Sequence, residues 1–310
     1  MKVLVTGARG AIGRAVVSLG AARGATMLGL GHGAWTGDTD LPPLNDWING
    51  DVSIDNLDRI RALAGLPDVV IHLAGGSHVG ASIERPSEDF RRTVSGGQAL
   101  LEWLRNNAPE TRLVIASSAA VYGDTLGSPI AETSAYAPAS PYGTHKAMVE
   151  LLSNAYSIQY GLKVAVIRLF SVYGPGLRKQ LVYDLFQRLR RGERDIILGG
   201  TGREIRDFLF IGDAAAMLLG ASALATADWP VLNGGYGQPV STAELARLVV
   251  TDFPEASVRF SGVGRKGDPS ALVADVSRAR ALGLLAPTSL ADGLAATRRW
   301  LDQVDVCPHP

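Results

Sequence analysis

The chain begins with Lys2-Val3-Leu4-Val5-Thr6, an apolar run that leads into Gly7-Ala8-Arg9-Gly10-Ala11-Ile12-Gly13. Apolar residues then recur at helical spacing as far as Gly24, which predicts a strand, a tight turn and a helix. A glycine-rich turn in this context is typical of dinucleotide binding. Gly7 permits the tight turn, Gly10 lets the backbone approach a pyrophosphate, and Gly13 lets the helix pack on the strand. Amides at the helix start then face the phosphates. A tight turn without a ligand is the alternative.

Length and composition narrow the class of protein. The 310 residues are 46% hydrophobic, which is enough for a large core in one or two domains. The formal net charge is zero, so charge gives no argument for binding nucleic acid or an anionic membrane. The only cysteine, Cys307, excludes an internal disulfide. We find no apolar span of the roughly 18 residues that a membrane helix needs. The first apolar run is too short for a secretory signal, and we expect a cytoplasmic protein.

Strand-like and helical segments alternate along the first half of the chain. Apolar runs lie at residues 3–6, 26–30, 69–73, 113–116 and 164–169, with helical patterns at 54–64, 87–107 and 141–160. This alternation predicts an α/β fold with a doubly wound parallel sheet. We expect residues 207–213 and 231–233 to return to the sheet, and helices at 242–250 and 290–304 to close a smaller domain.

The two predicted domains are therefore interleaved. Residues 1–169 and 209–240 form the Rossmann domain in this prediction. Residues 170–208 and 241–310 form a smaller α/β substrate domain. The loops after residue 168 are rich in glycine, proline and arginine, which is typical of segments that contact ligands.

A tyrosine and a lysine stand near the start of the helix predicted at 141–160. Ser140 and Pro141 suit the cap and first position of that helix. Tyr142 and Lys146 are four residues apart, so both lie on one side of its first turns. A cation beside a phenol lowers a tyrosine pKa that is ordinarily about 10. Tyr142 is then a candidate proton shuttle near neutral pH, although the same spacing also occurs by chance on exposed helices.

Ser118 follows the strand predicted at 113–116. In an open parallel sheet, ligands bind beyond the carboxyl ends of the strands, so we expect Ser118 in the same crevice as Tyr142. Its hydroxyl can donate a hydrogen bond to a substrate oxygen that gains negative charge. A serine that only caps backbone groups at the strand end is the alternative.

Taken in order, these segments resemble the extended short-chain dehydrogenase/reductase family, in particular its NAD(P)-dependent nucleotide-sugar epimerases, dehydratases and ketoreductases. The resemblance covers nearly the whole chain and implies catalytic roles for Ser118, Tyr142 and Lys146. It implies a cofactor site formed by the glycine turn, the ends of the early strands and the catalytic helix: Gly7, Arg9, Gly10, Ala11, Ile12, Gly13, His32, Asp51, Val52, Leu73, Ala74, Gly75, Tyr142, Lys146 and Val172.

The same resemblance implies a nucleotide-diphosphate sugar as substrate. Its contacts fall on Ser82, Ser118, Ser171, Arg206 and Arg265. The planar guanidinium of arginine suits bidentate binding of phosphate oxygens, so we expect the two arginines at the diphosphate. Ser171 stands where the family commonly has asparagine. We expect no metal, because His72, His78 and His145 lack the spacing of metal ligands.

The cofactor stays open between NAD and NADP at this stage. NAD-selective members of the family carry an acid after the second strand, where this chain has Gly31-His32-Gly33. A missing carboxylate removes a repulsion against a 2′-phosphate, and His32 or Arg9 could face one.

Three reactions follow from the resemblance. Dehydratases of the family place an Asp-Glu pair where this chain has Ala119-Ala120, and alanine transfers no proton. We therefore expect a 4-epimerase that acts through transient oxidation to a 4-keto sugar. An NADPH-dependent 4-keto-sugar reductase is the alternative, and a non-catalytic dinucleotide sensor is the second. The apolar residues around Trp103 fit either an ordinary core face or the homodimer that is common in the family.

Overall fold

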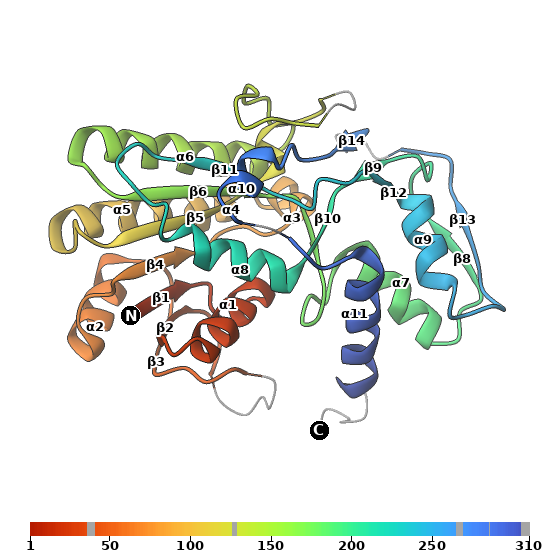
Figure 1. Cartoon of the computed structure of the whole chain (residues 1–310), viewed down its shortest axis with the longest axis horizontal. Coiled ribbons are helices and arrows are strands. Elements are labelled where there is room, and N and C mark those ends of the chain that lie inside the picture. Colours follow the sequence, from red (N-terminus) through yellow and green to blue (C-terminus); the bar gives the residue numbers. More distant parts are fainter. Residues whose placement is uncertain (36–40, 126–128, 265–268, 285, 305–310) are drawn as a thin grey trace.

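The computed structural model describes residues 1–35, 41–125, 129–264, 269–284 and 286–304. Its main sheet has seven strands in the order β11-β6-β5-β4-β1-β2-β3 (Figure 1). Every pairing in this sheet is parallel, which confirms the predicted fold class. The strands are β1 Lys2–Thr6, β2 Thr26–Gly31, β3 Asp46–Asn49, β4 Val69–His72, β5 Arg112–Ser118, β6 Val164–Leu169 and β11 Val231–Gly234.

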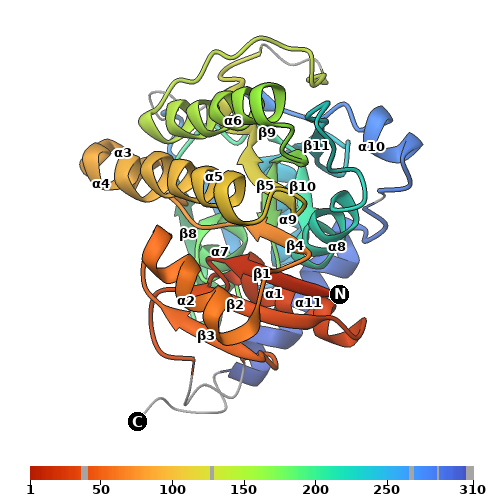
Figure 2. The same ribbon diagram turned by 90° about the vertical axis from the view of Figure 1, so that its left-hand side faces the viewer.

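Helices cover both faces of the sheet (Figure 2). One face packs against α1 (Ala11–Ala22) and α8 (Ile211–Ala221), and the other against α2 (Ile54–Ala64), α5 (Gly96–Asn107) and α6 (Pro141–Tyr160). Successive side chains of a strand point to opposite faces. Val3 and Val5 of β1 accordingly join the first core, and Leu4 joins the second.

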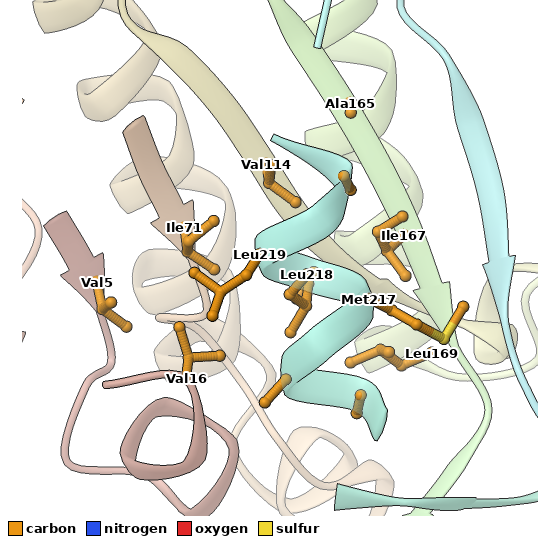
Figure 3. Close-up of a cluster of buried hydrophobic side chains, with 14 of the residues drawn as sticks. Val5, Val16, Ile71, Val114, Ala165, Ile167, Leu169, Met217, Leu218 and Leu219 are labelled. Atoms are coloured by element: carbon orange, nitrogen blue, oxygen red, sulfur yellow. The ribbon is translucent and has the colours of Figure 1, made fainter. Parts of the chain in front are cut away.

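Helix α8 supplies much of the first core. Figure 3 shows it lying across the strands, with Leu218 and Leu219 directed toward Ile71, Val114 and Ile167. Leu218 is 0% exposed, and burying one such side chain contributes about 1.5–3 kcal/mol. This packing fixes the sheet on which the site is built.

The strand order reverses between β1 and β4. From that point the chain proceeds through β2 and β3 to one edge, and through β5, β6 and β11 to the other. The carboxyl ends of strands on either side of such a reversal form a crevice that admits ligands. Gly7 directly follows β1 at this place, and Ser118 ends β5.

A smaller group of elements lies beside the main sheet (Figure 1, right). Its short strands are paired as β7 (Ser171–Tyr173) with β10 (Phe208–Phe210), β8 (Asp195–Leu198) with β13 (Ser257–Phe260), and β9 (Ile205–Arg206) between β12 (Val240–Ser241) and β14 (Ala271–Leu272). Helices α7 (Gln180–Arg190), α9 (Thr242–Val250) and α11 (Leu290–Val304) share a separate apolar cluster with them. The short helices are α3 (Val79–Glu84), α4 (Pro86–Phe90), a π-helical turn Arg91–Ser95, a 3₁₀ turn Ala119–Val121 and α10 (Ser277–Ala281).

Most of the predicted elements are present. The helices expected at 54–64, 141–160, 242–250 and 290–304 have those bounds. The helix expected at 87–107 is divided into α4, the π-helical turn and α5. The prediction that 207–213 returns to the main sheet is wrong, because β10 pairs with β7 and α8 begins at Ile211. So short an apolar run does not distinguish a strand from the start of a helix. Within the described ranges, no helix is both long and apolar enough to cross a membrane.

Candidate active site

The glycine turn after β1 leaves a helix end open to a ligand. Gly7 has a φ of +70°, and a Cβ at Gly13 would lie 2.4 Å from the carbonyl oxygen of Gly7. Helix α1 begins after Gly10 without a side-chain cap, so its first amides are available to an outside acceptor. Bare amides with a backbone too close for side chains suit a pyrophosphate. The residues present therefore fit the dinucleotide that the sequence implies.

The loop after β4 packs against this turn. A Cβ at Gly7 would lie 2.9 Å from the amide nitrogen of Ala74, and that amide donates to the Thr6 hydroxyl at 3.3 Å. The Thr6 hydroxyl also contacts Nδ1 of His72 at 2.8 Å. Burial lowers the pKa of His72 to about 3, so His72 is a neutral residue that supports the loop. Leu73 and Ala74 thus lie beside the glycine turn, and Gly75 packs against Thr93.

Charged side chains meet at the end of β2. Asp51 contacts Nε2 of His32 at 2.8 Å and Nη1 of Arg91 at 2.7 Å. These bonds, that from Arg91 first, lower the pKa of the Asp51 carboxyl. Arg9 lies at the same edge and donates from Nε to Ala34 O at 2.8 Å. A carboxylate, that of Asp51 on the loop after β3, therefore lies near the end of β2 although Gly31 carries none.

Helix α6 brings the proposed proton-transfer residues to the end of β5. Ser140 caps the helix by accepting a hydrogen bond from the Gly143 amide at 3.2 Å, so the predicted start is confirmed. The phenol of Tyr142 is hydrogen-bonded to Ser118. Nζ of Lys146 lies 5.9 Å from the centroid of the Tyr142 ring and donates to Ala116 O at 3.0 Å. Ser118, Tyr142 and Lys146 thus meet in one place although they lie on two elements.

Burial sets the protonation of these groups. It lowers the pKa of Lys146 to about 8, against the opposing effect of Asp89 and Glu150. It raises the pKa of Tyr142, which the hydrogen bond to Ser118 lowers in part. The sequence predicted a lowered pKa for Tyr142. The direction is the reverse here, because Lys146 is turned toward Ala116 O and desolvation dominates.

Ser82 supports the start of α6. Its hydroxyl oxygen accepts from the Tyr142 amide at 3.0 Å, and its proton is donated to Val79 O at 2.7 Å. The side chain is 0% exposed. The structure therefore places Ser82 beneath Tyr142, as an anchor between α3 and α6.

The residues predicted to hold substrate beyond the sheet lie in the smaller group of elements. Ser171 begins β7 and pairs with Phe208 of β10, and Val172 is buried beside it. Arg206 ends β9 and donates to Ile205 O at 2.8 Å. Between them, the buried Asp207 carboxylate accepts from the amides of Tyr236, Gly237 and Ala274, which gathers three segments near Arg206. Arg265 lies outside the described residues, as does Cys307.

Two buried clusters of ionisable side chains escaped the sequence analysis. Glu150 and Arg168 are 0% and 3% exposed and form a salt bridge at 2.7 Å. Glu150 also accepts from Ser117, the residue before Ser118. Its position four residues after Lys146, on the same helix face, is a signal that could have revealed it. The second cluster joins His145 to Asp89, and no pattern links residues so distant in sequence.

His78 has a local role at the start of α3. Nδ1 of His78 accepts from the Ala81 amide at 3.2 Å and caps α3. Across the described ranges, no three histidine, cysteine or acidic side chains are grouped so that they could hold a metal ion.

Comparison with known proteins agrees with this geometry. Residues 3–228 match the model of the NAD dependent epimerase/dehydratase family. UDP-glucuronate 4-epimerase 3 of Arabidopsis thaliana is 30% identical, over 96% of this chain and 76% of its own length. The structure of a UDP-glucose 4-epimerase of Thermotoga maritima with UDP-glucose is similar, with a TM-score of 0.90, 26% identity and coverage of 98% and 99% of the two chains. A UDP-glucose 4-epimerase of Thermus thermophilus in complex with NAD has a TM-score of 0.86 at 27% identity, with coverage of 97% and 99%.

Because Lys146 is buried, the Lys146→Met variant should differ from the unchanged protein in stability by an amount that depends on pH. A lysine whose pKa falls from 10.5 to about 8 on folding destabilises the native state below pH 8, because the charge is costly to bury. The effect disappears as pH rises through 8 toward 10.5. Lys146→Met should therefore unfold with a free energy about 3 kcal/mol higher at pH 7, and the advantage should vanish near pH 10.5.

Urea unfolding of both proteins at a series of pH values measures this difference. Lys163→Met provides a control, because the amine of Lys163 keeps contact with water in the native protein. Its replacement should therefore give no comparable change with pH. A Lys146→Met protein that is less stable at pH 7, by an amount independent of pH, contradicts the assignment.

Proposed function

The chain belongs to the NAD dependent epimerase/dehydratase family, among the extended short-chain dehydrogenases/reductases, and on that premise we propose that it is a nucleotide-sugar 4-epimerase. The observation that carries the proposal is the contact of Tyr142 with Ser118 near the buried Lys146, at the same edge of the parallel sheet as the glycine turn. The named relatives are 4-epimerases, which favours this reaction over a reductase or a sensor.

The proposed chemistry needs one proton-transfer residue. A bound nicotinamide dinucleotide supplies a group that takes up and returns hydride. The Tyr142 oxygen removes the proton of the C4 hydroxyl and later gives it back, and Ser118 donates a hydrogen bond to the sugar oxygen. The Lys146 ammonium lies 5.9 Å from the centroid of the Tyr142 ring, so its charge favours the phenolate, although burial opposes this effect more strongly. Ala119 and Ala120 transfer no proton, so the site has the groups for epimerisation and lacks the pair used for dehydration.

We propose NAD as the cofactor, because the Asp51 carboxylate lies near the end of β2. Asp51 reaches His32 at 2.8 Å, and its carboxylate repels a 2′-phosphate at that edge. NAD in the solved complex of the Thermus thermophilus relative supports the same choice. The contacts expected from Arg9, Ala11, Ile12 and Val52 belong to this proposal.

We propose that the substrate is a UDP-sugar, as in the named relatives. Arg206 and Arg265 would hold its diphosphate, with Ser118 and Ser171 at the sugar. In this arrangement residues 1–169 and 209–240 bind the dinucleotide, and residues 170–208 and 241–310 bind the nucleotide sugar. The separate apolar cluster around α7, α9 and α11 supports that division.

A homodimer is the proposed assembly. The residues around Trp103 are buried and belong to the core. The outer face of α6, by contrast, exposes Met148, Leu151 and Ile158 at 37%, 54% and 67%. An apolar stripe at helical spacing on an outer face suits packing against a second copy.

If Tyr142 transfers the proton, removal of its phenolic oxygen should slow the reaction. Tyr142→Phe should reduce kcat for UDP-sugar epimerisation by at least about 100-fold, because it removes the group that transfers the proton. Binding of NAD should change little, and steady-state kinetics with isothermal titration separates the two effects. Tyr160→Phe, at the exposed end of the same helix, should keep normal kcat. Normal turnover by Tyr142→Phe would refute the role.

The role of Asp51 predicts a change in cofactor preference. Asp51→Asn should lower the ratio of NADP to NAD dissociation constants about fivefold, since it removes roughly 1 kcal/mol of repulsion against the 2′-phosphate. Titration calorimetry with both dinucleotides measures the ratio. Asp55→Asn, on the neighbouring α2, is the control. An unchanged ratio in Asp51→Asn contradicts the proposal.

The apolar face of α6 predicts the behaviour of one surface variant. Leu151→Glu should sediment as a monomer while the unchanged protein sediments as a dimer, because the variant would bury a charge in the interface. Leu63→Glu on α2, where the leucine is 61% exposed, should remain dimeric. A dimer that survives Leu151→Glu places the interface elsewhere.

A further inference from the structure

Asp89 is a buried acid that the proposed reaction does not use. It lies in α4 and is 7% exposed. Its Oδ2 is 2.5 Å from Nδ1 of His145, and His145 stands between Tyr142 and Lys146 on α6. The ring of Phe90 meets the His145 ring edge-on at 5.4 Å and closes the pair from outside. Asp89 and His145 are thus held together at the first turns of α6, which also carry Tyr142 and Lys146.

The second oxygen of Asp89 faces the loop after β4. A Cβ at Gly76 would lie 1.7 Å from Oδ1, so only glycine fits there. Gly76 is fixed in turn, because its amide donates to the Thr93 hydroxyl at 2.7 Å. The Asp89 carboxylate therefore connects α6 with the loop that lies against the glycine turn.

Among the ionisable groups around Lys146, Asp89 is an acid that no arginine pairs with in the described structure. Glu150 is the other acid near the ammonium, but it is already paired with Arg168 at 2.7 Å and accepts from Ser117. His72, which also faces Lys146 from β4, is neutral. Asp89 acts on both Lys146 and Tyr142 through its charge.

The remaining charged groups near α4 are engaged with one another toward solvent. Glu88 contacts Arg85 at 3.0 Å and Arg92 at 2.6 Å, and Arg91 contacts Asp51. They are partly exposed, so water screens their effect on the buried site. His145 remains the direct partner of Asp89, and it holds the carboxylate in place.

We propose that Asp89, held by His145, is a positioning residue of the active site, whose carboxylate joins the first turns of α6 to the loop after β4 and sets a negative charge against His145, the residue before Lys146. This inference rests on the proposed function. It adds a residue that touches neither substrate nor cofactor and acts through Tyr142 and Lys146.

The charge of Asp89 can be removed with little change of shape. In Asp89→Asn, the negative charge that favours the ammonium and opposes the phenolate is lost, so Lys146 and Tyr142 should both lose their protons at lower pH. Both limbs of the pH profile of kcat/KM should move about one unit toward acid. A purely structural role would lower activity or stability and leave the limbs in place.

A second measurement needs no turnover. The ionisation of Tyr142 is followed by ultraviolet absorbance as pH is raised. The titration of a Tyr142→Phe protein is subtracted from that of the same protein with Tyr142, which leaves the signal of this one phenolate. The titration midpoint should move about one unit toward acid when both carry Asp89→Asn. Glu88→Gln removes the same charge one residue away and should shift neither readout. Should Asp89→Asn not fold, Asp89→Ser removes the carboxylate, leaves a hydroxyl for His145 and gives the same test.

Unshifted limbs and an unshifted phenolate midpoint in a folded Asp89 variant overturn the proposal. If the unaltered protein epimerises no nucleotide sugar, the proposed function fails, and the phenolate titration still decides the role of Asp89.

Discussion

The burial of one ammonium group, that of Lys146, is the constraint on which the rest of the site depends. A 7% exposed lysine in the first turns of a helix is costly to charge, and the structure offsets the cost with the carbonyl of Ala116 and the acids of α4 and α6. Burial also raises the pKa of Tyr142. The buried lysine therefore lowers the stability of the native state at the proposed proton-transfer site, a cost that is common in active sites.

The arrangement around Lys146 explains why the fold and the site are inseparable. Ser118 reaches Tyr142 because β5 and α6 pack on one side of the strand reversal. The loop after β4 lies against the glycine turn on one side, and Gly76 in that loop touches Asp89 on the other. Dinucleotide, sugar and proton-transfer residues would therefore share one edge of the sheet, although they come from segments far apart in sequence.

Much of this could be predicted from the sequence. The glycine turn, the alternation of elements and the cap at Ser140-Pro141 are local patterns, and local patterns determined β1, α1 and the bounds of α6. The pairing of β10 with β7 was missed, since a three-residue strand carries too little periodicity. Asp51 was named among the cofactor residues, but its contact with His32 at the end of β2 was missed, because it comes from another loop. The lowered tyrosine pKa failed for a related reason, since burial is a property of the whole fold. His145 and Asp89 became meaningful only once α4 and α6 were seen in contact.

In this proposal the site oxidises C4 and returns the same hydride to the opposite face. Its proton-transfer groups suffice for one such exchange, and the alanines after Ser118 remove the route to dehydration. The most direct measurement follows a UDP-sugar deuterated at C4 by mass spectrometry and NMR, with cofactor absorbance recorded together. We expect an epimeric product that retains the deuterium at C4, with no net change in the oxidation state of the cofactor. Consumption of one reduced cofactor per product, or loss of the deuterium to solvent, would contradict it.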